Sequence, residues 1–238
     1  MRDPCNSGPS ERPAMNDDDS TAAPAERLRE KLVHGSGRWF VAASVGIVWL
    51  LDHLVSDRIV IGGVLDPRLV GVVTGFERVS TVIMLVVSLL LLYALFRPRP
   101  QLLLRSAATY LAVSVLQVAA NVLSMVLTAH VKSGSGLTTL WDVAAVYGMS
   151  VVVFMFVYLL LDVSTPGGAF VWPSREGQLP PTPHLLDYLF ISLNVNSTYG
   201  PTSEALMSRP GKLIMALQTL LAILMLTVLI ARAVGATS

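Results

Sequence analysis

Long apolar stretches alternate with short polar segments along this chain. Five of the stretches approach or exceed the roughly 20 residues that an α-helix needs to cross a bilayer. They cover Trp39–Val55, Val79–Phe96, Leu103–Val131, Leu140–Leu161 and Leu213–Val234. This pattern predicts an all-α integral membrane protein with about five transmembrane helices.

A sixth apolar run, Leu185–Val195, is too short to cross a bilayer as a helix. At 1.5 Å per residue it extends about 16 Å, which is about half of the hydrocarbon core. A loop rich in Pro and Gly precedes it and a polar turn follows it. Segments of this length are re-entrant, interfacial or buried in protein, because irregular backbone at membrane depth must be shielded from lipid. We therefore expect a short re-entrant helix here.

The organisation of the chain follows from these runs. Residues 1–36 are polar and are expected to form a disordered tail, in which AERLREKLV predicts a short charged helix at the membrane surface. Residues 37–135 are expected to form a three-helix membrane region, and residues 136–238 a second unit of two spans and the short helix. The tail has no apolar core segment of the kind found in a cleavable signal peptide. Met15 is a second candidate for the initiator.

Composition strengthens the membrane interpretation. The 238 residues are 53% hydrophobic and 14% charged, whereas a soluble domain carries about 25% charged residues. The mean hydropathy is +0.62. The net charge is +1 and no basic cluster contains interleaved aromatics, so nucleic acid is not an expected partner. The expected partner is the lipid bilayer, and the expected location is the inner (plasma) membrane.

The sequence contains none of the motifs that indicate an enzyme. Its four histidines are scattered without a second ligand at helical spacing, and Cys5 is the only cysteine. The Gly-Ser-Gly at 134–136 lacks the surroundings of a nucleophile elbow, and no phosphate-binding glycine pattern is present. We therefore predict no enzymatic activity, no cofactor and no metal site.

The stretch from Asp187 to Leu217 has an unusual order of elements: a half-length helix opened by Asp-Tyr leads into a polar turn with Gly, and a Gly-Lys pair then enters the last span. This order resembles the pore module of tetrameric potassium channels. The resemblance implies an outer helix at 140–161, a pore-like re-entrant helix at 185–195 and an inner helix at 213–234. It also implies monovalent ions as possible partners and a homo-oligomer, which would be a tetramer.

The turn departs from the potassium-channel filter. A working filter is built from rings of backbone carbonyls, which glycines help to orient. Here Gly200 keeps the first glycine, but Pro201 fixes its own φ and β-branched Thr202 replaces the second glycine. The sequence therefore predicts a degenerate filter without the usual potassium selectivity. The C-terminal half is also similar to bacterial membrane proteins of unassigned function that look like filter-less relatives of this pore.

Two groups of polar residues are candidate sites. The filter-like turn consists of Asn196, Ser197, Thr198, Tyr199, Gly200, Pro201 and Thr202. Its polar side chains either line a vestibule for hydrated ions or cap the carboxyl end of the short helix. In the last span, Thr219 and Thr227 fall on one face, with Gln218 displaced by about 100°. They either line a pore or form hydrogen bonds between helices.

Ionisable and polar side chains elsewhere in the apolar runs have simpler expectations. Five ionisable residues lie near span ends, where we expect them to reach headgroups or water: Asp52, His53, Glu77, Asp142 and Asp162. For Asp52 and His53, which lie inside an apolar run, a proton-linked role is the alternative. The third span carries a polar stripe that is expected to face a neighbouring helix: Ser114, Gln117, Asn121 and Ser124.

These observations leave three functions open. The first is a weakly selective ion channel-like protein without a working potassium filter. The alternatives are a non-conducting membrane scaffold or sensor that keeps the pore-module fold, and a small-solute transporter. The orientation is also open, since Lys and Arg place the loop at 164–211 in the cytoplasm whereas the channel resemblance places it outside. A membrane-embedded hairpin or an extra crossing over Ile59–Gly75 would reconcile the two, and so would a resemblance that is structural only, with inverted insertion.

Overall fold

The structure is a computed structural model. It describes residues 24–33, 39, 43–44, 46–50, 67–96, 100–127, 136–173, 180–197, 205–206 and 208–237. The helices are α1 (Pro24–Val33), α3 (Pro67–Phe96), α4 (Pro100–Leu127), α5 (Gly136–Ser164), α6 (Leu185–Asn196) and α7 (Arg209–Thr237). Two short strands, β1 (Phe170–Val171) and β2 (Ala205–Leu206), interrupt the helical pattern. Residues 39, 43–44 and 46–50, within the expected first span, are also helical.

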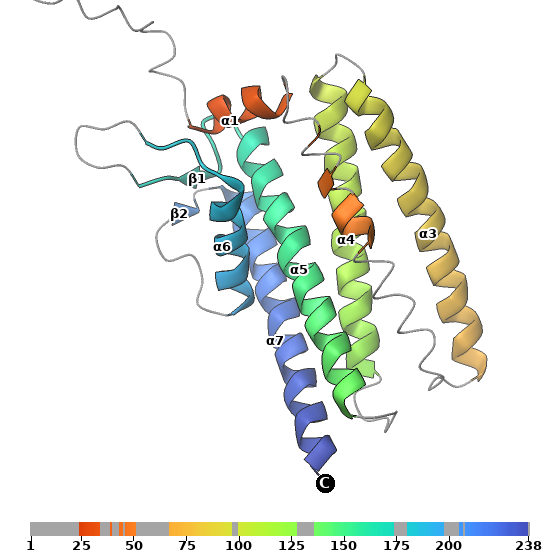
Figure 1. The fold of residues 1–238 in the computed structure, drawn as a ribbon. Helices are drawn as coiled ribbons and strands as arrows, with labels where there is room; N and C mark the ends of the chain where they lie inside the picture. Colours follow the sequence, from red (N-terminus) through yellow and green to blue (C-terminus); the bar gives the residue numbers. More distant parts are fainter. Residues whose placement is uncertain are drawn as a thin grey trace, which may run out of the picture.

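Four long helices lie side by side, and the short α6 lies against two of them (Figure 1). Helix α5 is central, because it packs against α4, α6 and α7 and also contacts α1. Its apolar residues run around the whole circumference, which is the pattern of a helix covered on several sides. Three helices are long and apolar enough to cross a membrane, over Gln101–Val126, Trp141–Ser164 and Arg209–Ala231. The membrane-protein prediction is consistent with this.

The ends of α4, α5 and α7 lie within four residues of the expected spans, and the start of α3 differs more. The short helix was expected at Leu185–Val195 and is observed at Leu185–Asn196. Helix α3, in contrast, begins at Pro67 rather than at Val79. Proline is favoured in the first turn of a helix, and the Glu77-Arg78 pair does not break a helix that has already started. Residues 67–75 are part of α3, so they do not form a separate hairpin or crossing, and that part of the expectation over Ile59–Gly75 is wrong. Residues 59–66 lie outside the described residues.

The strand pair was not predicted. β1 pairs with β2 in antiparallel orientation, with Phe170 opposite Leu206 and Val171 opposite Ala205. β1 follows α5 closely, and β2 stands just before α7. The chain therefore leaves α5, runs down α6, and returns to the level of β1 before α7 begins (Figure 1).

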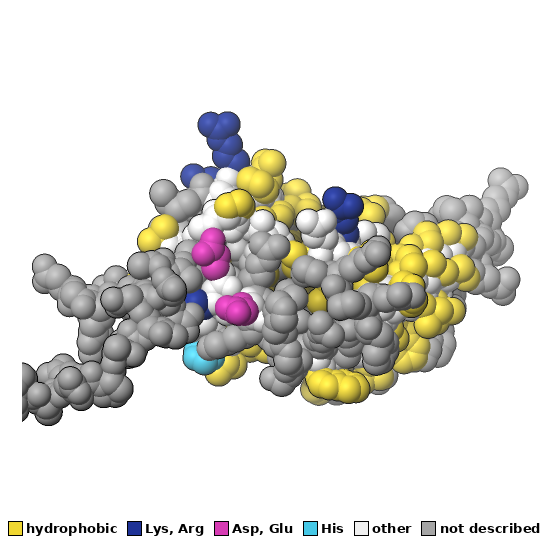
Figure 2. Space-filling view, turned by 90° about the horizontal axis from the view of Figure 1, so that it is seen from above, with side chains coloured by type: hydrophobic (Ala, Val, Ile, Leu, Met, Phe, Trp, Pro, Cys, Tyr) yellow, Lys and Arg dark blue, Asp and Glu magenta, His cyan; other side chains and the backbone are white. Residues whose placement is uncertain are grey.

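Helix α1 lies across the end of the bundle at which α5 ends and α6 begins (Figure 1). We call this the α1 end. Nη2 of Arg27 donates a hydrogen bond of 2.8 Å to the backbone carbonyl of Pro180, and Ala25 is buried. The short charged helix expected from AERLREKLV is thus confirmed. Figure 2 looks onto the α1 end, where basic, acidic and histidine side chains are visible. The carboxyl end of α7 lies at the opposite end of the bundle (Figure 1).

The outer surface of the bundle is apolar. Exposed large side chains follow one another along α7: Leu213, Leu217, Leu220, Ile223, Leu226, Ile230 and Val234. A similar surface covers the part of α3 between Val79 and Tyr93. Soluble proteins rarely expose apolar patches of this extent, whereas a bilayer is a suitable solvent for them.

Candidate functional site

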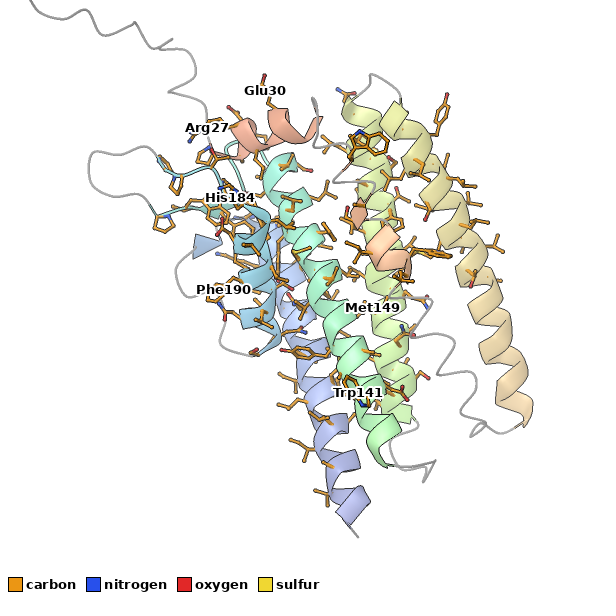
Figure 3. All side chains as sticks on the ribbon, in the orientation of Figure 1. Arg27, Glu30, Trp141, Met149, His184 and Phe190 are labelled. Atoms are coloured by element: carbon orange, nitrogen blue, oxygen red, sulfur yellow. The ribbon has the colours of Figure 1, made fainter. Side chains whose placement is uncertain are left out.

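Helix α6 turns one face toward α5 and α7. Its buried residues are Tyr188, Ile191, Ser192, Val195 and Asn196, at the i, i+3, i+4, i+7, i+8 spacing of a single helix face. The opposite face is exposed and apolar. Phe190, which is 52% exposed, points away from the other two helices (Figure 3). Three of the five buried residues carry a polar group, so burial of α6 requires hydrogen-bond partners for them.

The amino end of α6 is fixed by its own sequence. Oδ2 of Asp187 accepts a hydrogen bond of 2.6 Å from the backbone N–H of His184. This contact uses an acidic residue in the first turn of the helix, where negative charge is favoured by the helix dipole. Pro183 is buried just before it. The helix therefore begins at Leu185, at the α1 end of the bundle.

Next to this end, the side chain of Asp162 organises the loop that follows α5. Its Oδ1 accepts hydrogen bonds from the backbone N–H groups of Ala169 and Phe170, at 2.6 Å and 3.1 Å. Its Oδ2 accepts from Tyr188 Oη at 2.6 Å and from Trp172 Nε1 at 3.3 Å. We call this group of five residues the Asp162 centre. It connects α5, the β1 segment and α6 through one side chain.

Aromatic rings surround the Asp162 centre. The rings of Trp172 and Tyr188 meet edge to face with centroids 5.4 Å apart, and Phe170 meets Tyr158 in the same way at 5.8 Å. Edge-to-face pairs of this kind stabilise a packed core beyond the area that they bury. Asp162 is fully buried among them. The expectation that Asp162 reaches headgroups or water is therefore wrong, because the following loop folds over it and supplies three donors, and Tyr188 of α6 supplies the fourth.

A second polar group lies further down α6, around Gln218 of α7. Nε2 of Gln218 donates to the backbone carbonyl and to Oγ of Ser192, both at 3.0 Å, and to Oδ1 of Asn196 at 3.1 Å. Oε1 of Gln218 accepts a hydrogen bond of 2.6 Å from Tyr158 Oη. Ser150 Oγ donates to Oδ1 of Asn196 at 3.4 Å. These five residues form what we call the Gln218 network, which joins α5, α6 and α7.

The Gln218 network lies inside the bundle rather than on its surface. Gln218, Ser192, Ser150 and Tyr158 are fully buried, and Asn196 is 4% exposed. Ser192 Oγ also donates to the carbonyl of Val151 in α5, at 2.8 Å. Unpaired polar groups in such a place cost free energy, whereas paired ones fix the relative position of the helices. The network therefore fixes the carboxyl half of α6 between its two neighbours.

The structure describes the beginning of the filter-like turn. Asn196 belongs to the Gln218 network, and Ser197 Oγ lies 3.2 Å from Tyr147 Oη of α5. The last turn of α6 is closed by the Ser197 backbone N–H, which donates to the Leu193 carbonyl at 2.9 Å. The helix end is thus capped by backbone, while the side chains of Asn196 and Ser197 contact α5 and α7. The rest of the turn, 198–202, lies outside the described residues.

The two threonines of the last span do not join other helices through the hydrogen bonds that the structure describes. Thr219 Oγ1 donates to the Met215 carbonyl at 2.9 Å, and Thr227 Oγ1 donates to the Ile223 carbonyl at 2.8 Å. Both bonds run within α7, four residues back. Interhelical hydrogen bonding is therefore confirmed for Gln218, but the hydroxyls of Thr219 and Thr227 satisfy their own helix.

A cavity of about 370 Å³ lies beneath the carboxyl end of α6, and we call it the α6 cavity. Its walls come from Val143, Ala144 and Tyr147 of α5 and from α7 between Ala222 and Leu229. Asn196 and Ser197 form its polar end. The volume falls within the range of about 300–1,000 Å³ that is usual for small-molecule sites. Pattern reasoning on single segments missed this cavity, because its walls come from three helices.

The polar stripe of α4 does face a neighbouring helix. Ser114, Gln117 and Asn121 are buried, and Asn121 Nδ2 contacts Met149 Sδ of α5 at 3.9 Å. Figure 3 shows Met149 on α5, where α5 runs beside α4. The stripe therefore contributes to packing between α4 and α5, as expected.

The described residues contain no group of three His, Cys, Asp or Glu side chains that could hold a metal ion. Of the ionisable residues expected near span ends, Asp52 and His53 lie outside the described part of the chain, and Asp142 is half-buried near the start of α5. What the arrangement around α6 offers is a set of fixed hydrogen-bond donors and acceptors beside an apolar cavity. No protein-family model, curated protein or solved structure matches this chain.

Proposed function

We propose that this chain is a multi-pass membrane protein whose pore-like module is closed and non-conducting, and that it serves as a membrane scaffold or sensor. The Gln218 network carries this proposal. In an ion pathway, the polar groups near the tip of the short helix must be available to ions. Here Ser192, Asn196 and Gln218 bond to one another within a single chain.

The energetics favour the closed arrangement. Breaking a buried hydrogen bond leaves a polar group unsatisfied, at about 1–3 kcal/mol for each group. The Gln218 side chain alone takes part in four hydrogen bonds with Tyr158, Ser192 and Asn196, in three of which its two N–H groups are shared among three acceptors. Exposing these groups to an ion pathway would require several of these bonds to break at once.

We further propose five membrane crossings and a re-entrant α6. The pairing of β1 with β2 supports the re-entrant path, because it brings the chain back to the level at which α6 began. Helix α1 and the carboxyl end of α7 lie at opposite ends of the bundle, which requires an odd number of crossings (Figure 1). Helices α3, α4, α5 and α7 supply four of these, and the apolar run Trp39–Val55 is the proposed fifth.

The α1 end is proposed to face the cytoplasm. Arg27, Arg29 and Lys31 belong to α1, and Arg105 lies near the start of α4. Lys and Arg in short segments beside spans favour the cytoplasmic side. Both segments lie at the same end of the bundle as the start of α6 (Figure 1). Under this orientation α6 enters from the cytoplasm, the reverse of the orientation that a potassium-channel pore requires.

Ion permeation is the second candidate, and two observations favour it. Helix α6 ends about half-way down the bundle, and the carboxyl end of a helix carries partial negative charge that attracts cations (Figure 1). In addition, only 28% of the apolar window of α7 is buried within one chain, so α7 is available for contacts between copies in a homo-oligomer.

Ion flux into liposomes containing the purified protein separates the two candidates. The closed-module proposal predicts no cation flux above that of protein-free liposomes. The proposal would be overturned if the wild type supports flux and a Gly200→Val variant with intact folding loses it. The filter-like turn would then line a pathway. A membrane protein of unrelated fold at the same density is the control for leakage caused by reconstitution.

A further inference from the structure

The α6 cavity combines apolar walls with a buried hydrogen-bond donor. Asn196 lines the cavity and is 4% exposed. Its Oδ1 accepts from Gln218 and Ser150, but among the described residues no acceptor lies within hydrogen-bond distance of its Nδ2. A buried amide N–H without an acceptor is destabilising. An occupant that brings an acceptor atom to this donor would satisfy it.

The walls restrict what that occupant can be. Below Asn196 and Ser197 the cavity is lined by side chains such as Met225 and Leu226 of α7. An ion or a sugar would lose its hydration against these walls without replacement. A plain acyl chain would match the walls but would leave Nδ2 of Asn196 without an acceptor.

We propose that the α6 cavity binds a membrane-dissolved, largely apolar molecule that carries one carbonyl oxygen. The oxygen accepts the hydrogen bond of Asn196 Nδ2 at the polar end of the cavity, and the apolar remainder lies between α5 and α7. Ala144 and Leu226 line the cavity and are exposed, so the cavity opens on the apolar flank of the bundle, where such a molecule enters from the bilayer.

This site deepens the sensor role, and it rests on the proposed closed module. The position of Nδ2 depends on Gln218 and Ser150 holding the other end of the same side chain. Occupation of the cavity would satisfy a donor at the tip of α6 and would strengthen the contact between α5 and α7. Ligand binding and ion flux are separate measurements, so either proposal can fail alone.

Equilibrium binding of a radiolabelled ketone tests the proposal. The probes are 2-undecanone and its matched hydrocarbon undecane, applied to the wild type in nanodiscs, with empty nanodiscs as the background. We expect saturable binding of the ketone at one site per chain, with an affinity about fivefold to tenfold above that of undecane. Equal affinities would overturn the role of Asn196, and they would also be the result if a water molecule satisfied its donor.

Two matched variants locate the site. Ala144→Phe fills the cavity from an exposed position, and we expect it to abolish saturable binding. Ala112→Phe makes the same change at an exposed position of α4 outside the cavity, and we expect binding to remain. Saturable binding retained in Ala144→Phe, or lost in both variants, would overturn the assignment. Asn196→Asp keeps Oδ1 and removes the donor, so it should remove the preference for the ketone over undecane.

Discussion

The side-chain nitrogen of Gln218 lies 3.0 Å from the backbone carbonyl oxygen of Ser192, so a residue of α7 bonds directly to the main chain of α6. The same nitrogen also contacts Ser192 Oγ and Asn196 Oδ1. One side chain thus links α7 to the carboxyl half of the short helix. This contact explains how a helix of 12 residues keeps its place beside two much longer ones.

Replacing Gln218 with Leu should destabilise the protein and loosen α6. The change removes four hydrogen bonds and leaves Tyr158 and Asn196 with buried polar atoms to satisfy, so we expect a loss of about 2–4 kcal/mol in unfolding free energy. Unfolding in mixed micelles with increasing SDS measures this loss. Hydrogen exchange should show reduced protection in α6.

The matched control for this prediction is Thr219→Val, one residue away. Its hydroxyl bonds only to the Met215 carbonyl of its own helix in the described contacts. We expect a change of less than about 1 kcal/mol. Equal losses in the two variants would contradict the assignment of the interhelical contact to Gln218.

Asp162→Asn should destabilise the loop between α5 and α6. The two carboxyl oxygens accept hydrogen bonds from four donors. In Asn an NH2 group replaces one of these oxygens, and it cannot accept a hydrogen bond from the donors that it faces. We expect a loss of about 1–3 kcal/mol and faster proteolysis within the loop. Tyr188→Phe, which removes one of the four bonds, should cost less, about 1 kcal/mol. A larger effect of Tyr188→Phe would contradict the central role of Asp162.

Two neighbouring glycines separate a backbone effect from a packing effect. Gly167 and Gly168 have φ angles of +75° and +89°, which residues with a side chain adopt at a cost of about 1–2 kcal/mol. A Cβ at Gly168 would lie 3.1 Å from Oδ1 of Asp162 and 3.2 Å from Cβ of Ala25, whereas none of the described atoms lies within 4 Å at Gly167.

Gly168→Ala should therefore cost more stability than Gly167→Ala, measured by unfolding of the two variants under identical conditions. The additional loss of stability in Gly168→Ala measures the packing of the Asp162 centre against α1. If the two substitutions cost the same, α1 does not pack on this loop as described.

The sequence predicted α6 well because its limits are local. Pro183 and Asp187 mark its start, and the apolar run stops at a polar turn. The start of α3 was missed because Glu77 and Arg78 resemble the end of a span. A charged pair limits where a helix can meet lipid, but it does not end the helix.

The partners of the buried polar groups could not be predicted from the sequence. Asp162 is bonded by Trp172 and Tyr188, which lie 10 and 26 residues further along the chain. Its position at the end of an apolar run predicted contact with solvent. Only the folded structure shows that the side chain is buried. In the last span the helical spacing grouped Thr219 with Thr227, but the residue that contacts α6 is Gln218, on a different face.

Labelling of single cysteines tests most directly the proposed membrane path of the closed module, in which α6 enters and leaves the membrane on one side. Cys5 is the only native cysteine, so a Cys5→Ser background carries His184→Cys, Arg209→Cys or Ala233→Cys, all at exposed positions. A membrane-impermeant maleimide is applied to sealed vesicles of known orientation. We predict that His184→Cys and Arg209→Cys react from the cytoplasmic side and Ala233→Cys from the other. Reaction of His184→Cys and Arg209→Cys from opposite sides would mean that α6 crosses the membrane, and would contradict the account.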